Sequence, residues 1–228
     1  MSACGIDDEP YLSPVSPSAV VVTSNTSARI GGMSTSGESD YSPNYLLYYK
    51  IYISHMSVTS TISPEGMSGI NSTLNSDYSA ILPYTTLNTS TIQVFTPTVF
   101  SNRNFYPIRI GSTETASSET FSANSIMIDF SNVNDNTLPS LTNGGSSTLW
   151  RSTGGGAFTP LPLDNRRFRN FGELSNTQNR DVAQGSGSGT NYSYCAVYII
   201  KRGVNPNTLT AIYSAPTFIA VFRLPDSY

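Results

Sequence analysis

The most regular alternation along the chain is the stretch "NYLLYYKIYIS" at residues 44–54. In an extended strand, the odd positions from Tyr45 to Ile53 point to one side and the even positions from Leu46 to Tyr52 to the other. The same analysis predicts strands at 19–25, 91–99, 104–110, 125–130, 148–151, 192–202, 208–214 and 217–224, with a hairpin connection at 202–207. Gly, Pro, Asn or Ser clusters separate these short runs. They predict an all-β fold, mainly an antiparallel β-sandwich of at least eight strands.

One segment has helical spacing instead. Apolar side chains recur after Ser63 at intervals of three and four residues, at Met67, Ile70, Leu74, Tyr78 and Ile81. Ser63 can cap a helix that begins at Pro64, and Pro83 is expected to end it. The pattern predicts one amphipathic helix near 64–82 that packs on the sheet.

Composition narrows the class of protein. Only 12% of the 228 residues are charged, the net charge is −3, and Ser, Thr and Asn make up about 80 residues. Such a composition suits an extracytoplasmic β protein with polar loops. A negative net charge gives no basic field for nucleic acid, so we expect no nucleic-acid partner. The chain has no apolar run of membrane-spanning length, and residues 1–10 hold neither the basic region nor the apolar core of a signal peptide.

The first residues, "MSACG", place small side chains directly before Cys4. Bacterial lipoproteins have small residues before a cysteine that is acylated after cleavage. Prolines at 10, 14 and 17 then favour an extended chain, so we expect residues 1–18 to form a tether and 19–228 a single domain. Two alternatives stay open, namely an incidental cysteine in an ordinary flexible terminus and a disulfide between Cys4 and Cys195.

Four segments carry a family resemblance. The strand "YLLYYKIYIS", the helix "GINSTLNSDYSAILPYT", the segment "RRFRNFGEL" and the closing "APTFIAVFRLP" follow one another over most of residues 19–225. In style and order they resemble spirochaete (treponemal) lipoproteins of unknown function, some of which begin with a fibronectin-III-like module. The resemblance implies a lipid-anchored protein of the bacterial cell envelope, periplasmic or on the outer surface.

Motifs for catalysis are missing from the sequence. His55 is the only histidine, which excludes two-histidine zinc sites, and no nucleophile motif such as G-x-S-x-G accompanies it. Cys195 lies in the apolar strand "YSYCAVYII" and is expected to be a small buried residue. The glycine-rich stretches 153–158 and 184–191 lack the Gly-Lys-Ser/Thr ending of a phosphate loop. We therefore expect a protein that is not an enzyme and has no cofactor.

Two further motifs are weak candidates for binding. Residues 132–137 with Asp129 offer too few ordered oxygen ligands for a calcium loop, so we expect no metal. Residues 164–174, "DNRRFRNFGEL", mix Arg166, Arg167 and Arg169 with two Phe side chains. Arg and aromatic side chains together can bind single-stranded nucleic acid, but a loop whose Phe side chains fill the core explains them more simply.

The candidate ligand-binding residues are Tyr48, Lys50 and Tyr52, which share one face of the strand at 44–54. On an open surface they would form an amphipathic strip for a glycan or protein ligand, but a central strand of a sandwich would have this face covered. The leading hypothesis is a non-enzymatic envelope protein, structural or ligand-binding, attached to the membrane by a lipid on Cys4. The alternative is a secreted carbohydrate-binding or adhesive β-sandwich module without a lipid anchor.

Overall fold

The computed structural model describes residues 11–33, 37–85, 95–113, 116–131, 139–152, 168, 180–185 and 187–225. Within them, thirteen strands form one continuously paired sheet, which confirms the predicted all-β fold. The strands are β1 (Val20–Val22), β2 (Ser27–Ile30), β3 (Asn44–Ser54), β4 (Tyr106–Gly111), β5 (Ser117–Ser118), β6 (Thr120–Phe121), β7 (Ile126–Asp129), β8 (Ser140–Thr142), β9 (Ser146–Arg151), β10 (Val182–Ala183), β11 (Tyr192–Val204), β12 (Ala211–Tyr213) and β13 (Thr217–Arg223). All pairs are antiparallel except β10 with β3.

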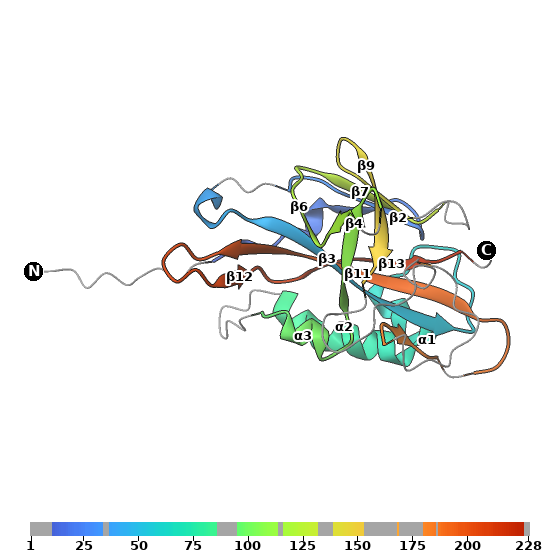
Figure 1. The fold of residues 1–228 in the computed structure, drawn as a ribbon. Helices are drawn as coiled ribbons and strands as arrows, with labels where there is room; N and C mark the ends of the chain where they lie inside the picture. The colour runs from blue at the N-terminus through green and yellow to red at the C-terminus, as the bar shows by residue number, and fades with distance from the viewer. Residues whose placement is uncertain are drawn as a thin grey trace, which may run out of the picture.

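The two longest strands, β3 and β11, form the centre of the molecule (Figure 1). They pair along their whole shared length, from Asn44 opposite Arg202 to Ser54 opposite Tyr192. Ten of the eleven residues of β3 are buried. Both faces of this strand are therefore covered, which explains why its sequence is apolar or aromatic at nearly every position.

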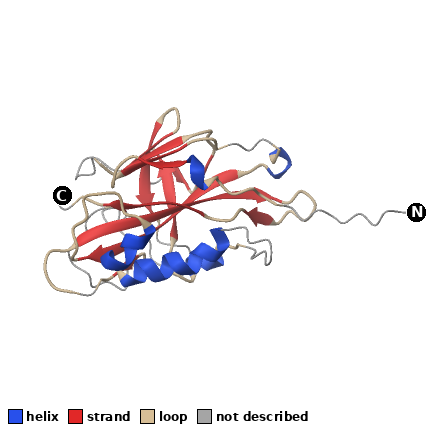
Figure 2. Cartoon of the chain, turned by 180° about the vertical axis from the view of Figure 1, so that it is seen from behind, coloured by secondary structure: helices blue, strands red, loops and turns tan. Residues whose placement is uncertain are grey.

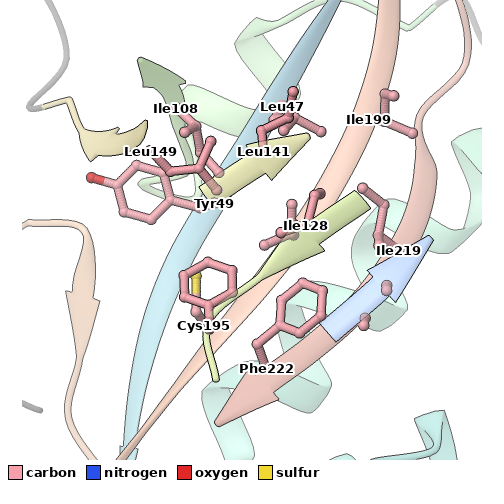
Figure 3. Close-up of a cluster of buried hydrophobic side chains, with 14 of the residues drawn as sticks. Leu47, Tyr49, Ile108, Ile128, Leu141, Leu149, Cys195, Ile199, Ile219 and Phe222 are labelled. Carbon is pink, nitrogen blue, oxygen red and sulfur yellow. The ribbon is translucent and has the colours of Figure 1, made fainter. Parts of the chain in front are cut away.

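The sheet curls over one face of this central pair. Its order is β1-β2-β7-β8-β9-β4-β3-β11-β12, with β13 on β11, and the Arg223 amide donates to the Asn25 carbonyl oxygen at 2.7 Å, which connects β13 to the β1–β2 turn. The core between the facing layers holds the odd positions of β3 from Tyr45 to Ile53, as predicted. Figure 3 shows part of it, with Leu47 and Tyr49 near Leu141 and Leu149 of the opposite layer.

Helices cover the other face of the central pair (Figure 2). They are η3 (Pro64–Gly66), α1 (Met67–Ile70), α2 (Ser72–Thr85) and α3 (Thr98–Ser101); two short 3-10 turns, η1 (Pro17–Ala19) and η2 (Ser39–Tyr41), lie elsewhere. The predicted stripe is confirmed, because Met67, Ile70, Leu74 and Ile81 are buried in a second core with the even positions of β3. This core packs rings on rings, such as Tyr48 stacked on Phe100 at 4.6 Å between centroids.

The helical segment differs from the prediction in two details. It breaks at Asn71, whose side-chain oxygen accepts the amides of Thr73 and Leu74 and so caps α2. Pro83 was expected to end the helix but lies inside α2, which continues to Thr85. The missing amide of Pro83 removes only one bond of the ladder, the one to the Ser79 carbonyl oxygen, and Tyr84 after it packs on Phe95.

Two other predictions were wrong. The strand predicted at 91–99 is not formed where the structure describes it: α3 begins at Thr98 and buries Phe100, and residues 91–94 lie outside the described residues. The β-branched run misled the prediction because the Thr96-Pro97 pair starts a turn there.

The second wrong prediction is the length of the tether, which was expected to include residues 1–18. Leu12 and Val15 are buried, and the Thr217 hydroxyl donates to the Val15 carbonyl oxygen at 2.5 Å. Residues 11–18 thus belong to the folded body, because their two apolar side chains pack into it, and residues 1–10 lie outside the described residues.

Candidate functional site

The candidate residues Tyr48, Lys50 and Tyr52 lie beneath the helical layer. Their exposed fractions are 8%, 5% and 0%. The structure therefore brings them together on one face of β3. Of the two possibilities, an open surface strip or a covered face, it shows the covered face. Whether they bind a ligand stays a prediction; what the structure shows is that α2 and α3 cover them.

Lys50 forms a buried ion pair with the helix above it. Its Nζ lies 2.6 Å from Oδ2 of Asp77 in α2 and also donates to the Arg103 carbonyl oxygen at 2.7 Å. The Tyr52 hydroxyl donates to the same Asp77 oxygen at 2.9 Å. Burial, followed by the charge of Asp77, raises the pKa of Tyr52 well above its ordinary value, so this phenol stays neutral.

A second buried ion pair lies on the opposite face of β3. Asp181 accepts two hydrogen bonds from the Arg151 guanidinium, at 2.8 Å from Nε and 2.6 Å from Nη2, and one from the Tyr49 hydroxyl at 2.7 Å. Both charged side chains are fully buried. Burial alone would lower the pKa of Arg151, but Asp181 and Tyr49 outweigh it and raise that pKa above its usual value.

A third buried pair connects the N-terminal segment to β11. Lys201 Nζ lies 2.7 Å from Oε2 of Glu38, and the other carboxylate oxygen accepts the backbone amide of Ser13 at 2.6 Å. Ser214 contributes a hydroxyl that accepts the Lys201 amide at 2.9 Å. Glu38 therefore holds two segments that are far apart in the sequence against the end of β11.

The three buried ion pairs have a common arrangement. Each joins a strand of the sheet, namely β3, β9 or β11, to a segment that is not one of its strands: α2, the turn at 180–181, or the loop before η2. A buried charge without a partner costs several kcal/mol, and each of these charges has a partner and further hydrogen bonds. Each pair therefore fixes a segment against the sheet.

Sequence analysis did not find these pairs. Lys50 was noticed only as part of an amphipathic strip, although a lysine within a strand this apolar was itself a signal that an acidic partner packs on it. Asp77 is within the helical segment whose apolar stripe was predicted, one residue before Tyr78 of that stripe. Arg151 and Asp181 gave no local signal, because they are thirty positions apart in the sequence and no periodic pattern connects them.

The structure also places three other candidate residues, Cys195, His55 and Phe168. Cys195 is a free, fully buried thiol, as predicted, and burial raises its pKa well above the ordinary value, followed by the effect of Asp181. His55 is half-buried after β3 against Gly187, and its Nδ1 has no hydrogen-bond partner within the described residues. Of the segment at 164–174 the structure describes only Phe168, which is fully buried against Tyr49 and Phe130. That agrees with the core-filling interpretation for this residue.

Several predicted features lie outside the described residues. They are Cys4, the glycine-rich stretch 153–158, residues 132–137, and Arg166, Arg167 and Arg169. In the part of the chain that the structure describes, no three His, Cys, Asp or Glu side chains are grouped as metal ligands would be. No helix in that part is long and apolar enough to cross a membrane.

A cavity of about 360 Å³ opens where β3 begins. Within the described ranges it is lined by Met33, Pro43, Tyr45, Ser122, Ala123, Asn124 and Asn143.

Comparison with protein families, curated proteins and solved structures gives no match to this chain.

Proposed function

We propose that this chain is a non-enzymatic protein of the bacterial cell envelope, attached to a membrane by a lipid on Cys4. In this proposal the folded body is a rigid scaffold with a structural or ligand-binding role. The lipid supplies the membrane affinity, because each buried methylene of an acyl chain adds about 0.8 kcal/mol.

The observation that supports this proposal best is the place where the N-terminal segment joins the body. The Leu12 side chain lies against Gly203, which belongs to the β11–β12 hairpin. The N-terminal segment therefore enters the folded body beside this hairpin. This hairpin extends at one end of the molecule (Figure 1). Whatever precedes Tyr11 in the sequence therefore starts from that end.

The same end exposes apolar side chains. Tyr11 is 48% exposed, Val204 41%, and Leu209, in the hairpin loop, 79%. Leu209 also has a φ of +56°, an uncommon conformation for a branched side chain, and its amide donates to the Asn205 carbonyl oxygen at 2.8 Å. An apolar tip is expected at an end that faces lipid, where Tyr and Leu side chains are favourable.

The distance from Cys4 to the body is short. Cys4 precedes Tyr11 by seven residues, which can span at most about 25 Å when fully extended. A lipid on Cys4 would thus hold the hairpin end near the membrane surface. The three buried ion pairs support the non-enzymatic part of the proposal, because they use the interior charges to fix the scaffold.

Detergent phase partition in the cells that make the protein tests this proposal. We expect the wild-type chain in the detergent phase and Cys4→Ser in the aqueous phase with an unchanged melting temperature. Cys195→Ala is the matched control: it removes the other cysteine and is expected to stay in the detergent phase. If wild type and Cys4→Ser both partition to the aqueous phase, the anchor is refuted and the secreted-module alternative is favoured.

A further inference from the structure

The cavity at the start of β3 is built from four separate segments. Met33 follows β2, Pro43 directly precedes β3 and Tyr45 lies in it, Ser122 to Asn124 follow β6, and Asn143 lies in the β8–β9 turn. Met33 and Tyr45 are buried and form its floor, whereas Ser122, Asn124 and Asn143 are exposed at its rim. Its volume, about 360 Å³, is within the range of small-molecule sites.

One lining residue, Tyr45, has a buried hydroxyl group with no partner in the described part of the chain. Tyr45 is 1% exposed, and within the described residues its hydroxyl makes no hydrogen bond. A buried donor left unpaired costs about 1–3 kcal/mol, which a ligand oxygen reaching the floor would recover. The ring itself is held in place against Phe121, at 5.8 Å between centroids.

The rim has fixed backbone and unused amides. The Met33 amide donates to the Asn124 carbonyl oxygen at 2.9 Å, and the Asn143 amide donates to the Gly145 carbonyl oxygen at 3.0 Å. No hydrogen bond of the Asn124 or Asn143 side chain occurs in the part of the chain that the structure describes. Each amide therefore offers both a donor and an acceptor to a ligand.

We propose that this cavity binds a neutral, hydroxyl-rich ligand, specifically a sugar residue. None of the seven lining residues is charged, so nothing in the lining would pair with an ionic ligand. Amides and hydroxyls match the alternating donors and acceptors of a sugar, while Met33, Pro43 and Ala123 provide an apolar wall for its C–H groups. This inference rests on the ligand-binding role in the proposed function but does not involve the lipid.

NMR titration of the folded Cys4→Ser protein tests the inference without any lipid. The probes are the methyl glycosides of glucose, galactose and mannose, and N-acetylglucosamine. We expect at least one to bind with a dissociation constant in the millimolar range or tighter, with amide shifts confined to Met33, Ser122–Asn124 and Asn143. Glucuronate, in which a carboxylate replaces the hydroxymethyl group of glucose, should bind more weakly than methyl glucoside.

Variants separate this site from non-specific binding. Asn124→Ala and Asn143→Ala are each expected to weaken the best probe at least tenfold, and Tyr45→Phe, which removes only the hydroxyl, to weaken it similarly. Asn102→Ala, an exposed amide at the end of α3, is the control and should bind as wild type. If Tyr45→Phe fails to fold, the two rim variants decide. The inference is refuted if no probe binds, if shifts lie elsewhere, or if the rim variants bind normally, and none of these outcomes bears on the lipid at Cys4.

Discussion

Asp181 combines side-chain and backbone contacts at one position. Its carboxylate accepts from Arg151 and Tyr49, and its backbone carbonyl accepts the Ile51 amide at 2.8 Å. It thus holds the turn at 180–181 against β3 and neutralises a guanidinium that has no exposed surface.

Asp181→Asn is the residue-scale test of this arrangement. The amide keeps the size of the carboxylate but leaves the buried Arg151 charge without compensation, so we expect a loss of about 3–5 kcal/mol in the free energy of unfolding. Asp40→Asn, at an exposed position of η2, should change it by less than about 0.5 kcal/mol. Urea denaturation measures both, and equal stabilities of the two variants would contradict the structural role of Asp181.

Cys195 gives a second test at this scale. Its thiol is fully buried and its pKa is raised, so the reactive thiolate is scarce and inaccessible. In a Cys4→Ser background we expect a polar thiol reagent to label the native protein only as fast as it unfolds, and we expect Cys195→Ser to cost about 1–2 kcal/mol. Rapid labelling of the native protein would show that this part of the core is open.

At the scale of elements, hydrophobic periodicity predicted which side chains of the long strand and of the helical segment are buried. The alternation at 44–54 gave both faces of β3 correctly, and the three-and-four spacing gave the buried face of α1 and α2. It failed for strands that form only because a neighbouring strand pairs with them. β5, β6 and β10 have two residues each, too few for a periodic signal. The cavity at Tyr45 was equally invisible, because four segments far apart in the sequence form it.

The contact between β3 and α2 can be tested by a double-mutant cycle. Asp77→Leu alone leaves the Lys50 charge buried and should cost about 3–5 kcal/mol, whereas Lys50→Met combined with Asp77→Leu should recover most of that loss. Thermal or urea unfolding of the four proteins measures the coupling. If the double variant is as unstable as the sum of the single ones, the ion pair is not the reason for the cost.

At the scale of the whole molecule, three layers are packed face to face: the curled part of the sheet, the central β3–β11–β13 group, and the helices (Figure 2). Tyrosines fill both interfaces, with Tyr45 and Tyr49 in one, and Tyr48, Tyr52 and Tyr198 in the other. Burial, which is the first cause in each case, raises the pKa of Tyr48 to about 12 and raises those of Tyr49, Tyr52 and Tyr198 as well.

These shifts predict how stability depends on alkaline pH. Phenols of the unfolded chain ionise near pH 10, whereas the folded protein keeps the buried ones neutral. The stabilisation is therefore complete below about pH 10 and is lost as the pH rises above it. In an ultraviolet titration of the fourteen tyrosines we expect the buried phenols to ionise above pH 10, together with unfolding. A single smooth titration of a protein that stays folded would contradict the burial.

The claim central to the functional account is that Cys4 is the lipid-bearing first residue of the mature protein. Mass spectrometry of the N-terminal peptide, isolated from membranes of the cells that make the protein, tests it most directly. We expect a peptide that begins at Cys4, lacks Met1 to Ala3, and carries a thioether-linked diacylglycerol. A peptide that retains those residues with an unmodified thiol, or a disulfide between Cys4 and Cys195, would contradict the account.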